Sequence, residues 1–187
     1  MRHYLQSGTW TVIGIDPGQE VDVTTIHQHI IAGSYLDNND RDQILLGVEI
    51  AGSDVAQSSP FLTLEGAAIG DKVRLTYPNN IQREYRVKGI FQAREMSVAD
   101  RQAFISRKEM ASVLGRSVFD TRASQILVKI EQMGDESRFI EEFESLGING
   151  QIRSWEEYGG MGSIVSSFNI IASLINGIGL IVAAIVM

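Results

Sequence analysis

Short apolar runs separated by turn-forming residues dominate the first 157 positions of the chain. Residues 9–15 form a β-rich run that ends at the turn signal Asp16-Pro17-Gly18. Residues 72–77 alternate as Lys-Val-Arg-Leu-Thr-Tyr, and the apolar alternation returns over residues 83–91 after Pro78-Asn79-Asn80. This pattern predicts a β-hairpin. Shorter strands are predicted over residues 43–46, 103–105, 125–130 and 151–155.

Apolar positions at helical spacing predict several short helices between these strands. Thr24 is expected to cap a helix that carries Ile26, Ile30 and Ile31 and ends at Gly33. A second helix starts within residues 47–51. Two more have an apolar face. One follows the capping box of Ser106 and Glu109 and carries Met110, Val113 and Leu114 up to Gly115. The other is expected to be capped by Asp135 and carries Phe139, Ile140, Phe143 and Leu146 up to Gly147.

Alternating strands and short helices, with a hairpin between them, predict an α+β fold. The expected architecture is a mixed sheet with short helices, of the split β-α-β type. Residues 52–69 are the least regular stretch and predict a loop.

The last thirty positions have a different character from the rest. Every charged side chain lies between Arg2 and Glu157, and residues 158–187 contain none. A helix that crosses the hydrocarbon core needs about 20 such residues. Asn169 and Asn176 would lie on one face of this helix, together with small Ser and Gly residues that favour packing between membrane helices. We therefore expect a domain over residues 1–157 and a transmembrane helix over 158–187, with a buried core helix as the alternative.

Charge and composition exclude several functions. The net charge of −7 belongs to the first part of the chain, and an acidic domain repels phosphate backbones, so nucleic acid is not expected as a partner. The absence of cysteine removes disulfides, thiolate catalysis and thiolate zinc sites. No signal peptide opens the chain, which leaves either a cytoplasmic head or a missing front end.

Residue patterns typical of an active site are absent. There is no phosphate-binding loop and no nucleophile elbow. His27 and His29 lie two positions apart, which separates them on a helix, and no third metal ligand accompanies them. Asp37, Asn38, Asn39, Asp40 and Asp42 predict a solvated turn, because the glycine and terminal glutamate of a calcium loop are missing. Trp10 and Trp155 are interpreted as core or interface anchors. We predict no catalytic, cofactor-binding or metal-binding residues and no enzyme activity.

The order of the motifs resembles a known family. The residues are Val12-Ile13-Gly14-Ile15-Asp16-Pro17, Ile31-Ala32-Gly33-Ser34-Tyr35-Leu36, Ile44-Leu45-Leu46-Gly47-Val48-Glu49-Ile50-Ala51, Ile69-Gly70-Asp71-Lys72-Val73-Arg74-Leu75 and Tyr85-Arg86-Val87-Lys88-Gly89-Ile90-Phe91. In order and spacing they resemble the MacB-like periplasmic core domain of FtsX-type ABC transporter permeases, over most of residues 9–130. The tail resembles the second transmembrane helix of such a permease. The stretch 52–69 is longer than the usual link of the family.

The resemblance implies a function without catalysis. Such permeases act as dimers with a cytoplasmic ABC ATPase, and they pass ATP-driven movement to an extracytoplasmic domain. That domain handles an exported peptide, a lipoprotein or a partner protein. The resemblance also implies that residues 1–157 lie on the extracytoplasmic side of the cell membrane, that the tail contacts lipid, and that a first membrane helix and first strand precede Met1 in a longer protein. The alternative is a membrane-anchored binding or adhesion module without an ATPase.

Overall fold

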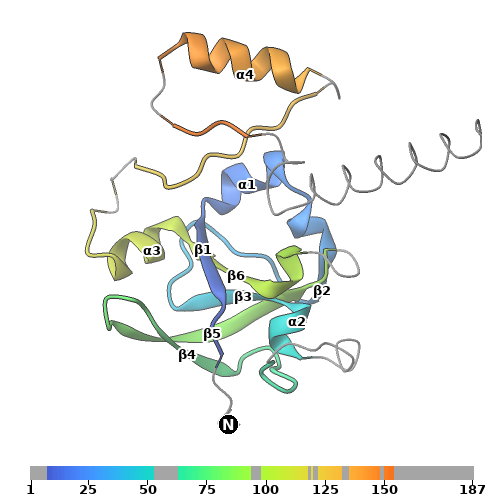
Figure 1. Ribbon diagram of the computed structural model, residues 1–187. Coiled ribbons are helices and arrows are strands. Elements are labelled where there is room, and N and C mark those ends of the chain that lie inside the picture. Colours follow the sequence, from blue (N-terminus) through green and yellow to red (C-terminus); the bar gives the residue numbers. More distant parts are fainter. Residues whose placement is uncertain are drawn as a thin grey trace, which may run out of the picture. The chain divides into compact units, whose positions relative to one another are not determined.

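Figure 1 shows the computed structural model of the chain, which describes residues 8–52, 63–93, 98–117, 119, 122–131, 135–147 and 150–153. The chain divides into two compact units, residues 1–128 and 129–187. The first unit is built on a six-stranded mixed sheet. In the second unit the described residues contain helix α4 (Glu136–Ser145). The predicted boundary between residues 157 and 158 lies outside the described residues.

Strands and short helices alternate in the first unit, so the predicted α+β class is confirmed. The strands are β1 (Thr11–Ile15), β2 (Ile30–Gly33), β3 (Gln43–Gly47), β4 (Lys72–Thr76), β5 (Gln82–Phe91) and β6 (Gln102–Ser106). The helices are α1 (Pro17–Val23), α2 (Val48–Ala51) and α3 (Arg107–Val113), with 3-10 turns η1 (Ile26–His29) and η3 (Val98–Arg101).

The strand order in the sheet is β1-β6-β3-β5-β2, and β4 pairs with β5. β1 is parallel to β6 and β3 is parallel to β5, whereas β3 and β6 run antiparallel. β5 is long enough to carry β4 along its first half and β2 along its second half. In the backbone register Arg86 lies opposite Lys72 of β4 and Gln43 of β3, so β5 is paired on both edges at this point.

Both faces of the central strands are buried. In β3, Ile44 and Leu46 belong to one apolar cluster, and Leu45 lies between them in a second cluster with Phe91 and Phe104. The rings of Phe91 and Phe104 lie 5.5 Å apart between centroids. A strand that is covered on both faces is a continuous apolar run. The predicted strands over 43–46 and 103–105 have this property and are confirmed, as is the hairpin over 72–91.

The predictions for residues 16–33 are only partly right: β1 ends before Asp16 and a short 3-10 turn does start at Ile26, but the other details are wrong. Asp16-Pro17-Gly18 is the start of helix α1, where a proline at the first position lacks only an N–H that needs no intrahelical partner. Thr24 ends this helix instead of starting the next one, and its N–H donates to the Glu20 carbonyl at 2.8 Å. Ile30 and Ile31 belong to strand β2, because pairing with β5 outweighs their helical spacing.

Two further predicted strands are contradicted. Residues 125–130 and 151–153 contain no strand, while Ser154 and Trp155 lie outside the described part of the chain. Ile126, Leu127 and Val128 are 79 %, 53 % and 56 % exposed. A strand needs a neighbour for its backbone groups, and no described strand pairs with these residues.

Helices α2, α3 and α4 form where they were predicted. The Glu109 N–H donates to the Ser106 hydroxyl at 3.2 Å, so the serine caps α3 as expected. Helix α4 begins after Asp135 as predicted, but the Asp135 side chain makes no capping hydrogen bond, so the predicted cap is wrong. Trp10 packs against the main apolar cluster, in agreement with its interpretation as a core anchor.

Candidate functional site

Polar side chains gather where the parallel strands β1 and β6 end and helices α1 and α3 begin. Because the two strands are parallel, both helices start at the same edge of the sheet. The loop formed by residues 37–42 joins both of these helix starts. Its Asn38 side chain accepts a hydrogen bond from the Gly18 N–H at 3.2 Å, and its Asn39 side chain accepts one from Lys108 at 3.4 Å. The same loop thus contacts the first turn of α1 and of α3.

Asp40 is the centre of this loop. Its carboxylate lies 2.5 Å from Lys88 Nζ and accepts the Asp37 N–H at 2.7 Å. Its carbonyl oxygen accepts the Ser106 hydroxyl at 3.0 Å. The side chains of Lys88 and Asp40 are only 22 % and 17 % exposed, so this ion pair is partly shielded from solvent. The expected solvated turn is therefore a loop anchored through one half-buried carboxylate.

Two longer ion pairs surround the loop. Arg41 Nη1 lies 3.8 Å from the Glu109 carboxylate, and Arg107 Nη2 lies 3.9 Å from the Asp16 carboxylate. The arginines are 47 % and 45 % exposed, so each pair contributes at most about 1 kcal/mol. These two pairs neutralise charges around the loop, while the shorter contacts of Asp40 hold the loop in place.

A second polar cluster lies between α1, η1 and β2. Burial raises the pKa of Glu20, and the nearby Thr24 hydroxyl partly offsets this effect. Burial also raises the pKa of Tyr35, and the nearby Glu20 carboxylate raises it further. The rings of His27 and Tyr35 lie edge to face at 6.1 Å between centroids, and His27 Nδ1 and the Tyr35 hydroxyl are buried without a hydrogen-bond partner among the described residues. Such groups often bind an ordered water.

The two histidines face different partners. His27 packs against Tyr35, whereas His29 Nδ1 lies 2.7 Å from the Thr25 carbonyl oxygen. Within the described ranges, no group of three or more His, Cys, Asp or Glu side chains is placed to hold a metal ion. In the charged loop the amino groups donate to carboxylate and amide oxygens, which is an arrangement that holds segments together.

Sequence reasoning missed the cationic partners of the loop. Lys88 is 48 positions from Asp40, and Lys108 is 69 positions from Asn39, so no local pattern connects them. One signal was present: Lys88 is a single charge within the otherwise apolar run Val87-Lys88-Gly89-Ile90-Phe91. A lone charge at the buried end of a strand needs an opposite charge, and the nearby acidic loop supplies it.

No known family matches this chain. The curated proteins contain no match either.

None of the helices described between residues 8 and 153 is both long enough and apolar enough to cross a membrane. The predicted helix over residues 158–187 lies outside the described part of the chain and stays a prediction.

Proposed function

We propose that this chain is the extracytoplasmic domain of an ABC transporter permease, which transmits ATP-driven conformational change to an exported substrate or partner protein. The observation that carries the proposal is the order of the motifs that resemble the MacB-like core domain. All five contribute strand residues to a single sheet: Val12–Ile15 to β1, Ile31–Gly33 to β2, Ile44–Gly47 to β3, and the two motifs over 69–75 and 85–91 to the β4–β5 hairpin.

The interlocked connectivity of the sheet supports a role in transmitting movement. β1 and β6 pair in register over five positions although they lie about ninety residues apart. The loop at residues 37–42 contacts the start of α1 through the Asn38 side chain and the cap of α3 through the Asp40 carbonyl. The Asp40 carboxylate ties the same loop to Lys88 of β5. A domain that passes movement from a membrane helix to a partner needs parts that move together as one body.

The finer parts of the proposal follow from the resemblance. They are the split β-α-β type of the sheet, the transmembrane helix over residues 158–187, and the extracytoplasmic location of residues 1–157 at the cell membrane. The proposed partners are a cytoplasmic ABC ATPase, a second copy of the permease, membrane lipid at the tail, and an exported peptide, lipoprotein or partner protein. No enzymatic step is proposed for the domain itself.

The parent protein and its associated ATPase test this function. We expect the full-length protein to contain a further membrane helix before this domain and to co-purify from detergent-solubilised membranes with an ATPase encoded beside it. The purified complex should hydrolyse ATP, and the variant Lys88→Met, which breaks the ion pair to Asp40, should alter the coupling of hydrolysis to partner binding. A full-length protein with one membrane span and no ATPase would refute the proposal.

The alternative is a membrane-anchored binding or adhesion module, which a single predicted membrane segment favours. In that case, cross-linking in intact cells would recover a binding partner and no ATPase. The two functions differ in their dependence on ATP, because only the transporter domain should change its contacts when ATP hydrolysis is blocked.

A further inference from the structure

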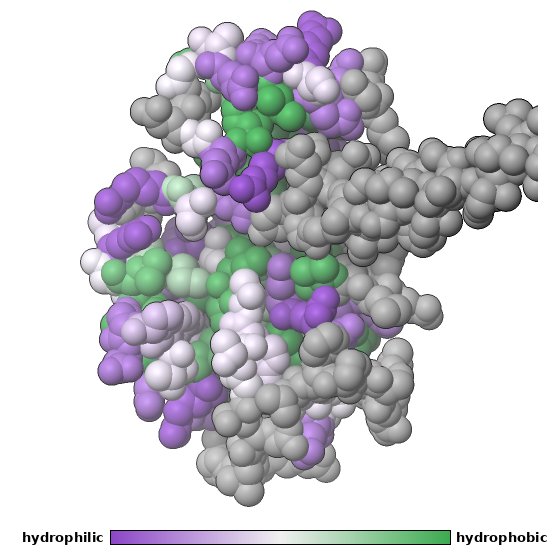
Figure 2. Space-filling view, viewed as in Figure 1, coloured by the Kyte–Doolittle hydropathy of each residue, from purple (hydrophilic) through white to green (hydrophobic). Residues whose placement is uncertain are grey.

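The β4–β5 hairpin carries a charge opposite to that of the chain as a whole. Residues 72–91 contain five Lys or Arg residues and one glutamate, so the hairpin has a formal charge of 5 − 1 = +4, while the whole chain has −7. The five cations are Lys72, Arg74, Arg83, Arg86 and Lys88. Hydrophilic side chains gather in the lower left of Figure 2, where this hairpin lies in Figure 1.

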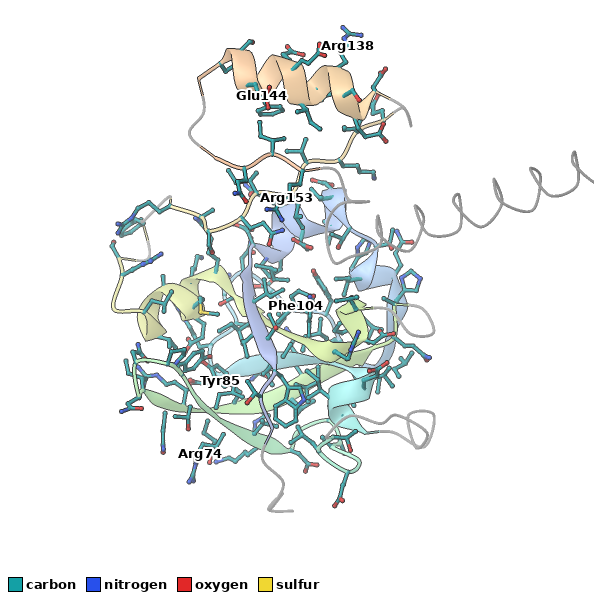
Figure 3. All side chains as sticks on the ribbon, viewed as in Figure 1. Arg74, Tyr85, Phe104, Arg138, Glu144 and Arg153 are labelled. Atoms are coloured by element: carbon teal, nitrogen blue, oxygen red, sulfur yellow. The ribbon has the colours of Figure 1, made fainter. Side chains whose placement is uncertain are left out.

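The register of the hairpin places most of these charges on one exposed face. Three cross-strand pairs share this face: Lys72 with Arg86, Arg74 with Glu84, and Thr76 with Gln82. All six side chains are exposed, whereas Val73 and Tyr85 on the opposite face are buried. Arg74 points away from the sheet in Figure 3. This face of six side chains is called the hairpin face below.

Several cations on the hairpin face lack a full counter-charge within the domain. Glu84 pairs with Lys72, at 2.5 Å from Nζ, and not with Arg74 directly opposite. Arg86 donates to the neutral Gly70 carbonyl at 3.4 Å. Arg74 forms no ion pair within the described residues. Like charges directly opposite one another, such as Lys72 and Arg86, destabilise a hairpin.

Protection of an exposed strand edge explains only part of this pattern. Charged side chains on an edge strand hinder pairing with other chains, and β4 pairs only with β5 among the described strands. Arg86, however, lies on β5 where that strand is paired on both edges. Its positive charge therefore has no such protective role.

We propose that the hairpin face binds an acidic segment of a partner protein. Cationic positions two apart on one strand are separated by about 6.6 Å, and positions directly opposite on the paired strand by about 5 Å between Cβ atoms. Carboxylates at alternate positions of an extended segment, or one turn apart on a helix, match this spacing. The central Glu84 and the net charge of −7 disfavour a uniform polyanion such as a nucleic acid or an anionic bilayer. Arginine suits the role because its guanidinium binds a carboxylate through two parallel hydrogen bonds.

This inference deepens the proposed function, because it names the surface and the chemistry with which the domain contacts a partner protein. It rests on that function only for the existence of such a partner. Peptide binding by the chain alone would stand even if no ATPase associates with the parent protein, so the two proposals fail separately.

The test is a binding titration of the full chain in a non-ionic detergent. The probe is a short fluorescent peptide of alternating glutamate and threonine, followed by fluorescence anisotropy at low and high salt. The matched probe has glutamine in place of glutamate. The variant R74E/R86E reverses two charges on the hairpin face, and the control R116E/R138E makes the same change of net charge at two exposed arginines elsewhere.

We expect the wild-type chain and the control to bind the glutamate peptide, more weakly at high salt. R74E/R86E should bind it about tenfold more weakly, which corresponds to about 1.4 kcal/mol. The same variant should gain affinity for a lysine-threonine peptide. If R74E/R86E fails to fold, as judged by tryptophan fluorescence, the single variant R74E takes its place.

Three results would overturn the inference. They are an absence of wild-type binding to the glutamate peptide, an equal loss of affinity in R116E/R138E, and binding to phosphatidylglycerol vesicles that is tighter than peptide binding and is lost in R74E/R86E. The last result would assign the hairpin face to a lipid surface instead of a protein.

Discussion

Tyr77 and Tyr85 form a buried pair whose hydroxyl groups lie 2.8 Å apart. Tyr85 is 0 % exposed and Tyr77 is 8 % exposed. Removing the Tyr77 hydroxyl leaves that of Tyr85 buried without its partner, which costs about 1–3 kcal/mol. Removing the Tyr85 hydroxyl costs less, because Tyr77 retains some contact with solvent. Replacing both removes donor and acceptor together, so the double variant should be less destabilised than the sum of the single variants.

The same pair makes the domain sensitive to alkaline pH. Burial is the main cause that raises the pKa of Tyr77 and of Tyr85. An unfolded tyrosine ionises near pH 10. A raised pKa in the folded state therefore stabilises the domain below pH 10, and this stability is lost as the pH rises above that value. Each such tyrosine contributes a slope of about 1.4 kcal/mol per pH unit, and the variant Y77F/Y85F should lose the contribution of this pair.

Urea unfolding at neutral pH and above pH 10 measures both effects. Tryptophan fluorescence is a suitable signal, because Trp10 packs against the apolar cluster that contains the tyrosine pair. If Y77F is as stable as the wild type, or if the double variant retains the full alkaline slope, the hydrogen bond and the buried ionisation do not have the assigned roles.

Four further outcomes are expected. Gly47→Ala should lower the free energy of unfolding by about 3 kcal/mol in urea, because an added Cβ would lie 2.2 Å from the Asp100 carbonyl oxygen of η3. The control Gly150→Ala, where an added Cβ meets no atom within 4 Å, should change it by less than about 0.5 kcal/mol. Ser106→Ala should lower the free energy of unfolding by about 1–2 kcal/mol, since it removes a helix cap and a donor to the loop; an unchanged melting temperature would contradict this. Asp40→Asn should cost about 1–2 kcal/mol and increase amide exchange in the loop, because a half-buried lysine loses its counter-charge. Residues 1–157 alone should be soluble while the full chain needs detergent, and a full chain that stays monodisperse in plain buffer by light scattering would refute the membrane helix.

Sequence patterns correctly predicted the elements whose contacts lie close together along the chain. The alternation around Tyr77 and Tyr85 encodes the hairpin within twenty residues, and the serine before α3 caps its own helix. Sequence reasoning failed where a distant strand decides the outcome. Ile30 and Ile31 were assigned to a helix but lie in β2, which pairs with β5 about sixty positions further on.

The candidate site was predicted only in part for the same reason. The acidic residues of the loop at 37–42 were identified, yet their degree of burial depends on Lys88 and Ser106, which come from β5 and the end of β6. The strand predicted over residues 125–130 has suitable side chains but no partner strand among the described residues. A short stretch of sequence shows which secondary structure its residues favour, but it does not show which strand will lie beside it in the fold.

Two strand-to-helix junctions of the sheet hold each other in place, which is a property that the proposed function needs. Gly47 and Ser106 have nearly the same backbone conformation, with φ −65° in both and ψ 148° and 147°. They differ in what packs against them. At Gly47 the backbone of Asp100, just before β6, leaves no room for a side chain.

At Ser106 the hydroxyl donates to the carbonyl of Asp40, just before β3. β3 and β6 are antiparallel neighbours, so the segment that precedes each strand covers the end of the other. Displacing one junction therefore requires displacing the other, because each is held by the chain that leads into its neighbour. This reciprocal contact joins α2 and α3 to the sheet as one mechanical element, as the proposed function requires.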